Sequence, residues 1–299
     1  MLISDFCRTF AGDMIKKSIL LVIVLAICVL PILANTENKK ESLFDWSVNA
    51  TLTSNYIWRG LYCGGPSLQL DATIGYAGFY ANMWWNIGAK DWTFTGLNPE
   101  VDVMIGFSRW GLNVNYLHCY YFDRYPDGTL SNFFDFRNHP RGGGGTTGEW
   151  RVSYTHAVSI TKGYDGQVTG LIAFRTFGRD GYYEEVKSEN DKVETELKRA
   201  YSTYIELGYN QQLGRNWTMA ARMGITPAKS LYTGYKGDFA IVMVSLKLQK
   251  QWNLDYVAIS SFAHVMLQPW QVTKDNLIRP IIDAVDQKLN VAVGCSVQI

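Results

Sequence analysis

Apolar and polar residues alternate along most of this chain, in segments of roughly ten residues each. In the segment that begins at Phe44, the apolar residues Trp46, Val48 and Ala50 are separated by polar ones. Alternation with a period of two predicts β-strands with one apolar and one polar face. Strands are expected at 44–56, 68–76, 79–86, 100–107, 112–120, 150–158, 168–177, 201–210, 217–223, 240–248, 254–265 and 289–299.

The connections between these segments are alternately short and long. Short connections are expected at 77–78, 109–111, 160–167, 212–216 and 250–253, and the connections between them are longer. Tight turns on one side and large loops on the other are typical of an antiparallel up-and-down transmembrane β-barrel, whose strand number is usually even. The sequence therefore predicts an all-β barrel of about 12 strands. A soluble β-sandwich, the alternative, would not produce this alternation.

The first 34 residues resemble an export signal rather than part of the fold. Lys16 and Lys17 precede the apolar run 18–30, and Ala34 is a small residue at a suitable cleavage position. We expect a signal peptide at 1–34, with translation starting at Met1 or Met14, and a barrel at 35–299. An uncleaved anchor helix is the alternative. No apolar run after residue 34 reaches the roughly 18 residues that a membrane helix needs.

Composition supports a membrane protein that does not bind nucleic acid. The net charge is +1, which gives no basic excess, while 10 Trp, 18 Tyr and 14 Phe provide the aromatic residues found at barrel interfaces. Three cysteines follow the predicted signal peptide. Cys63 and Cys119 both lie near the side of the long loops, so their pairing stays open, while Cys295 lies on an apolar strand face and is expected to be a small hydrophobe.

A family resemblance lies in the N-terminal part of the predicted barrel. Residues 54–60 read SNYIWRG, residues 66–70 read PSLQL, and residues 78–84 read GFYANMW. These segments resemble the TorF-like porin family of bacterial outer-membrane proteins, with its S-N-Y-x-x-R-G signature and a G-F-Y-x-G-x-W-like hairpin. The signature residues are Ser54, Asn55, Tyr56, Arg59 and Gly60. Ala81 and Asn82 depart from the glycine-containing form of the hairpin, and the close match covers about residues 48 to 86. The resemblance implies an outer-membrane barrel with a channel role, and it brings no catalytic residues.

The polar faces of the strands carry charges that we expect inside the barrel, since the apolar faces meet lipid. The expected lumen-lining residues are Asp71, Glu100, Asp102, Arg151, Arg175, Glu206, Arg222 and Lys247. Opposed acidic and basic walls would orient a small hydrophilic solute, and the bases slightly favour anionic or sugar-acid solutes. Alternatively, these charges pair with one another and fill the interior, because isolated buried charges are costly.

Two features of the long loops leave alternatives open. Arg59 is suited to packing a loop or, through its planar fork, to holding a lipopolysaccharide phosphate. The loop 123–148 contains Phe133, Phe134 and Phe136 and the glycines 142–145. It could fold inward as a constriction, or lie at the surface as a mobile loop or a ligand platform. The charged segment 182–199 is expected to be a solvated loop.

An enzyme is the less favoured class. An outer-membrane lipase needs a serine beside a histidine, yet Ser260 and His264 lie four residues apart in one strand, roughly 13 Å. His118 and His156 fall on apolar faces and suit an interfacial position. No spacing of His, Cys and carboxylates indicates a metal site, and no cofactor is implied.

The sequence therefore predicts a Gram-negative outer-membrane porin or channel for small hydrophilic solutes. The alternative is a non-conducting structural or adhesion barrel whose extracellular loops bind partners, especially the loops at 123–148 and 178–199.

Overall fold

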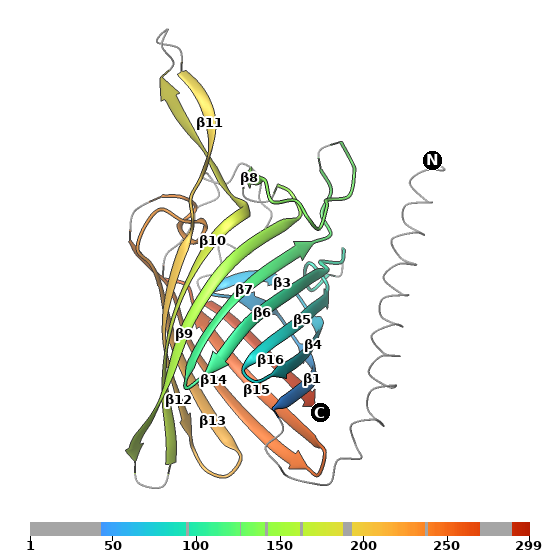
Figure 1. Cartoon of the computed structure of the whole chain (residues 1–299), viewed down its shortest axis with the longest axis vertical. Coiled ribbons are helices and arrows are strands. Elements are labelled where there is room, and N and C mark those ends of the chain that lie inside the picture. The colour runs from blue at the N-terminus through green and yellow to red at the C-terminus, as the bar shows by residue number, and fades with distance from the viewer. Residues whose placement is uncertain are drawn as a thin grey trace, which may run out of the picture. The chain divides into compact units, whose positions relative to one another are not determined.

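The structure, a computed structural model, describes residues 43–93, 96–125, 127–140, 143–161, 164–187, 193–236, 239–269 and 289–299. The predicted signal peptide and the two candidate start sites lie outside these residues. The described chain is almost entirely β-structure, as the period-two alternation predicts (Figure 1).

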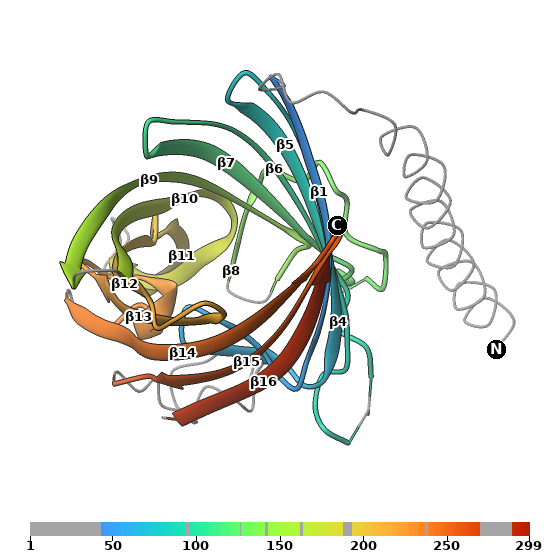
Figure 2. The same cartoon turned by 90° about the horizontal axis from the view of Figure 1, so that it is seen from below.

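Twelve strands form the wall of a closed antiparallel barrel, which confirms the predicted fold class. In ring order they are β1 (Phe44–Thr53), β4 (Ser67–Tyr76), β5 (Phe79–Gly88), β6 (Glu100–Arg109), β7 (Leu112–Tyr121), β9 (Thr146–Thr161), β10 (Tyr164–Lys187), β12 (Thr203–Gln212), β13 (Trp217–Thr226), β14 (Ala240–Leu254), β15 (Val257–Leu267) and β16 (Leu289–Gln298). Pairing of β1 with β16 closes the ring, which Figure 2 shows along the barrel. Closure leaves no exposed sheet edge around the wall.

Five smaller elements lie outside this ring of strands. They are β2 (Tyr56–Trp58), β3 (Leu61–Gly64), β8 (Asn138–Pro140), β11 (Val193–Arg199) and the 3-10 helix η1 (Leu231–Thr233). All five belong to long connections, so they lie at one end of the barrel, which we call the loop end. The opposite end is the turn end. No helix among the described residues has the length and apolarity needed to cross a membrane.

The turn end is built from very short reversals. Ala77 and Gly78 join β4 to β5 with φ of 53° and 94°, and Trp110 and Gly111 join β6 to β7 with φ of 54° and 81°. Two consecutive residues with positive φ form the hairpin turn whose twist matches that of the flanking strands. The reversal between β14 and β15 lies at 255–256 rather than at the predicted 250–253, because both strands pair further than the alternation indicates.

The two faces of the wall differ in the manner expected from the sequence. On β6, Ile105 is 66% exposed on the outward face, whereas Glu100 on the inward face is 5% exposed. On β9, Trp150, Val152 and Tyr154 are exposed and alternate with Arg151 and Ser153, which are partly buried. The barrel therefore presents an apolar outer surface and a polar interior.

The structure corrects three local predictions. The first strand ends at Thr53 rather than 56, because the chain leaves the wall there. The period-two alternation places Ala240 and Val242 on the same outward face of β14 as Val244 and Leu246. Both are buried in the interior instead, because the register shifts between the pairs Gly224–Met243 and Ile225–Ile241. Such a bulge turns one residue to the other face.

The third correction concerns the charged segment 182–199, which was expected to be a solvated loop. Its described residues form a β-hairpin that extends β10 beyond the barrel and pairs it with β11, from Gly181–Arg199 to Lys187–Val193 (Figure 1). Lys198 binds Glu184 across the two strands at 2.8 Å. Opposite charges across a strand pair stabilise a ladder in a segment whose composition alone resembles a loop.

Candidate functional site in the barrel interior

The first long connection, between β1 and β4, folds into the loop end of the barrel as a small hairpin. Strands β2 and β3 pair with each other, and the turn between them is formed by Arg59 and Gly60 with φ of 50° and 82°. We call residues 54–66 the inner hairpin. It contains the whole SNYIWRG signature, which the sequence analysis placed partly in the first strand.

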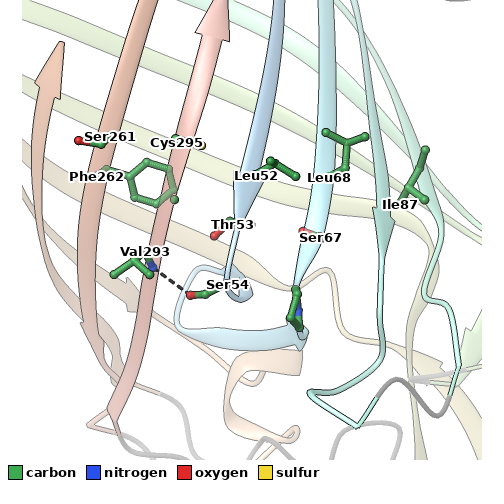
Figure 3. A pocket seen from close by; sticks show the side chains of 12 residues that line it. Leu52, Thr53, Ser54, Ser67, Leu68, Ile87, Ser261, Phe262, Val293 and Cys295 are labelled. Atoms are coloured by element: carbon green, nitrogen blue, oxygen red, sulfur yellow. Dashed lines mark hydrogen bonds between the residues drawn. The ribbon is translucent and has the colours of Figure 1, made fainter. Parts of the chain in front are cut away.

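The signature residues at its start close the end of the β1–β16 seam. The backbone N–H of Ser54 donates to Val293 O at 2.8 Å, and its hydroxyl accepts a bond from Val293 N at 3.0 Å (Figure 3). Asn55 Nδ2 donates to Val291 O at 2.5 Å. These bonds satisfy backbone groups that β16 exposes where β1 leaves the wall.

Tyr56 and Gly60 hold the hairpin to the inner face of the wall. The Tyr56 hydroxyl donates to Glu100 Oε2 at 3.0 Å, and Asn290 Nδ2 donates to Gly60 O at 3.1 Å. A Cβ placed on Gly60 would lie 2.9 Å from Val242 O, so the turn packs directly on the backbone of β14. Glycine is required at this position both for its positive φ and for this close approach.

Arg59 is the central contact of the inner hairpin. Its two terminal nitrogens each donate to one carboxylate oxygen of Glu149 at 2.8 Å, and one of them also donates to the Tyr232 hydroxyl at 2.7 Å. The guanidinium lies over the rings of Trp58 at 4.5 Å and Tyr204 at 4.3 Å. Of the two roles left open for Arg59, the structure shows packing of the loop, with the planar fork of arginine matched to a wall carboxylate.

A hydrophobic cluster surrounds this contact at the loop end of the interior. Its buried members are Leu61, Ala173, Tyr204, Leu231, Tyr232, Ala240 and Val242, and Trp58 packs against them. They come from the inner hairpin, from η1 and from the inward faces of β10, β12 and β14. The inner hairpin is therefore packed against the inward faces of β10, β12 and β14 as in a protein core.

The predicted acidic residues lie on one side of the ring. Asp71 on β4 accepts a bond from Asn82 Nδ2 at 2.8 Å, and Glu100 and Asp102 lie on β6. Ligand atoms of Glu100, Asp102 and Cys119 lie within 4.8 Å of one another, a set able to hold a metal ion. Sequence spacing does not indicate this set, because Cys119 is brought to β6 only by cross-strand pairing with Asp102.

The predicted basic residues lie on β9, β10, β13 and β14, of which β13 and β14 lie across the ring from β4 and β6. Arg151 donates to Glu149 at 2.6 Å, and Arg175 is buried with its guanidinium 5.4 Å from the Trp58 ring. Arg222 lies 3.4 Å from Glu206, while Lys247 contacts only the Phe262 ring among the interactions of the described chain. Glu206, which accepts a bond from Tyr204 at 2.7 Å, is the predicted acidic residue that lies beside them, on β12.

The third long loop, between β7 and β9, lies on the outward face of the wall instead of in the interior. His118, on the outward face of β7, bonds to Phe133 O at 2.9 Å and packs on the Phe133 ring at 4.5 Å. Phe136 packs edge-on against Phe177 at 4.8 Å. The structure therefore places these aromatic residues outside the barrel, and the inner hairpin occupies the loop end in their place.

Asp135 organises this loop. Arg137 binds its carboxylate at 2.8 and 2.9 Å, His139 binds it at 2.7 Å, and Tyr125 also donates to it. The hydrogen-bonded Arg137 side chain is the main cause that holds the pKa of the Asp135 carboxyl well below its usual range, against the opposing effect of burial. Asp135 is therefore ionised in the folded loop.

The remaining candidates for chemistry do not form a catalytic site. Ser260 bonds to the Ser296 hydroxyl at 2.7 Å on the neighbouring strand, whereas His264 lies opposite Lys247. Cys63 and Cys119, whose pairing was open, are not joined by a disulfide, and the Cys63 thiol donates to Leu61 O at 3.6 Å. Cys295 is exposed on the outward face of β16.

A groove of about 730 Å³ lies at the seam where β1 turns inward (Figure 3). Leu52, Leu68, Ile87 and Val293 line it, from β1, β4, β5 and β16 respectively. The groove lies where β1 ends at Thr53, opposite Ser67 at the start of β4, while β16 continues past this point to Leu289.

No family model and no curated protein matches the chain. Similar solved structures include the NanC porin, with a TM-score of 0.42 and 11% identity over 85% of this chain and 98% of that one. The translocator domain of the autotransporter NalP from Neisseria meningitidis has a TM-score of 0.38 and 10% identity over 94% of this chain and 97% of that one. OmpF of Salmonella typhi in complex with daunomycin has a TM-score of 0.37 and 8% identity over 86% of this chain and 97% of that one. The closed barrel itself is established by the strand pairing of this chain.

Proposed function

We propose that this protein is an outer-membrane channel through which small hydrophilic solutes pass, narrowed at its loop end by the inner hairpin. A closed barrel whose outward face is apolar has to be surrounded by lipid, because water would leave that surface unfavourably exposed. The predicted export signal at 1–34 would deliver the chain across the inner membrane of a Gram-negative cell. The long loops then face the outside of the cell, and the tight turns face the periplasm.

The inward-facing charges are the observation that carries this proposal. Asp71 and Asp102 lie on one side of the barrel interior, and Arg222 and Lys247 lie on the other. Ionisable residues at membrane depth are expensive and therefore mark solute pathways more often than structural cores. Opposed walls of this kind create a transverse field that orients a polar solute during passage. Nothing in this role requires a cofactor or a catalytic residue.

Planar-bilayer recording of the full chain, purified from membranes in detergent, tests the channel. We expect discrete current steps of uniform size, because a single rigid pathway gives one conductance level. Heat-unfolded protein of the same preparation is the control and should produce no steps. A barrel that is folded, as judged by heat-dependent mobility in gels, and yet stays silent would contradict the proposal.

A non-conducting adhesion barrel is the second candidate, and two observations favour it. The inner hairpin packs into the loop end of the interior, and the hairpin of β10 and β11 extends well beyond the wall (Figure 1). Replacing residues 182–199 by a four-residue glycine-serine linker separates the candidates. A channel keeps or increases its conductance after this change, whereas an adhesin loses the adherence of expressing cells to surfaces or to one another.

A further inference from the structure

Three basic side chains lie together in the barrel interior. They lie nearer to the turn end than the inner hairpin does. Arg222 on β13, Lys247 on β14 and His264 on β15 occupy inward-facing positions of three neighbouring strands. Lys247 is the direct cross-strand partner of His264, and Arg222 lies opposite Ser245, two residues from Lys247. We call Arg222, Lys247 and His264 the basic cluster.

The basic cluster carries more positive charge than its neighbours neutralise. Glu206 is the one carboxylate of the described chain within ion-pair distance of it, at 3.4 Å from Arg222, and Asn210 Oδ1 accepts a second Arg222 bond at 2.7 Å. Lys247 has no carboxylate within 4.0 Å in the described residues, and its ammonium lies 4.5 Å from the centre of the Phe262 ring. An ammonium that is half-buried beside another base, without a counter-ion, is costly to maintain.

A solute anion would supply the missing counter-charge. A carboxylate that enters the interior gains a charge-assisted bond from Lys247, while Arg222 keeps its own partners. On the far side of the ring, the Asp71 carboxylate offers hydrogen-bond acceptors to hydroxyl groups, while the buried Asn82 amide donates to it. A ligand with a carboxylate at one end and hydroxyls at the other therefore matches both walls.

From this arrangement we propose that the basic cluster is an anion-binding site of the channel, with Lys247 as its main contact, and that small polyhydroxylated carboxylates are the preferred solutes. This inference rests on the proposed channel function and adds the charge class and the binding residue. It also distinguishes Lys247 from Arg59, whose guanidinium already binds the Glu149 carboxylate.

Reversal potentials across a KCl gradient test the site. Wild type should favour chloride over potassium. Lys247→Gln should lower the ratio of chloride to potassium permeability about two- to fourfold, because it removes one positive charge beside a hydrated pathway. Lys247→Arg should keep the ratio. Lys250→Gln is the matched control on the same strand, because the Lys250 ammonium lies against the partly exposed Trp217 and Trp252 rings rather than in the basic cluster.

Occlusion by sugars tests the solute class in the same bilayers. Glucuronate should reduce the chloride current of wild type at concentrations where glucose and glucosamine do not, and Lys247→Gln should lose this difference. If conducting variants keep the wild-type selectivity and the same response to glucuronate, the anion site is refuted while the channel stands. A folded wild type that never conducts would overturn the channel, and the site with it.

Discussion

Arg59 at the loop end and Lys247 toward the turn end have opposite surroundings. At the loop end, Arg59 is held by both oxygens of Glu149 and by Tyr232, between two aromatic rings. Toward the turn end, Lys247 contacts a ring but no carboxylate of the described chain. A paired and an unpaired charge in one interior are therefore expected to have different roles. The paired arginine fixes a structural element, whereas the unpaired lysine remains able to bind a solute.

Arg59→Ala is expected to have the largest effect. It leaves the buried Glu149 carboxylate with only Arg151 as a direct ionic partner, so the free energy of unfolding should fall by about 3 kcal/mol. Arg59→Lys should recover only part of this loss. Lysine restores the positive charge, but its ammonium cannot bind both carboxylate oxygens through a planar fork. Denaturant unfolding in detergent micelles, followed by tryptophan fluorescence, measures both values.

Arg109→Ala is the control for this change. Arg109 also lies over a tryptophan ring, that of Trp110 at 4.5 Å, but it is exposed at the turn end. Its loss should cost less than about 0.5 kcal/mol. Equal losses for Arg59→Ala and Arg109→Ala would show that the pair with Glu149 does not hold the inner hairpin.

Acidification should loosen the third long loop by a smaller amount. The pKa of Asp135 is lowered in the folded loop, so its stabilising contribution is complete above the unfolded value of about 4 and declines as pH falls below it. Between pH 6 and pH 3, amide exchange at 127–139, corrected for intrinsic rates, should rise about tenfold. Asp135→Asn should exchange at similar corrected rates at both pH values. If the corrected exchange rates of Asp135→Asn still depend on pH, a titratable group other than Asp135 causes the dependence.

The smallest effect on conduction is expected from the third long loop. Phe133→Ala removes a ring that packs on His118 at 4.5 Å, outside the wall, so the loop should become more sensitive to protease while the single-channel conductance stays unchanged. Phe134→Ala, at a ring that is 69% exposed, should alter neither property. A conductance change in Phe133→Ala would place the loop in the pathway.

The wall of the barrel could be predicted from the sequence because the residues that determine each strand and turn are close together in the chain. The alternation around Ile105, and the glycines of the turns at 77–78 and 110–111, depend only on neighbouring residues. The bulge at Val242 could not be predicted, because it arises from pairing with β13 and from close packing against Gly60.

The interior contacts depend on long-range pairing and were only partly predictable. The eight charged candidates follow from alternation, but Glu149 was missed although it shares the inward face with Arg151, which the same alternation indicates. Arg59 lies 90 residues from Glu149 in the chain, so their pairing has no local signal. The Arg59-Gly60 turn inside the signature was the one local indication that residues 54–66 form a hairpin of their own.

The conductance of a variant that lacks the inner hairpin shows whether this hairpin narrows a conducting barrel. Replacing residues 55–65 with two glycines joins Ser54 to Pro66 by a short turn, which suits the direct pairing of Thr53 with Ser67. We predict a single-channel conductance clearly above that of wild type, with selectivity still dependent on Lys247. A folded variant with the conductance of wild type would contradict the proposed narrowing.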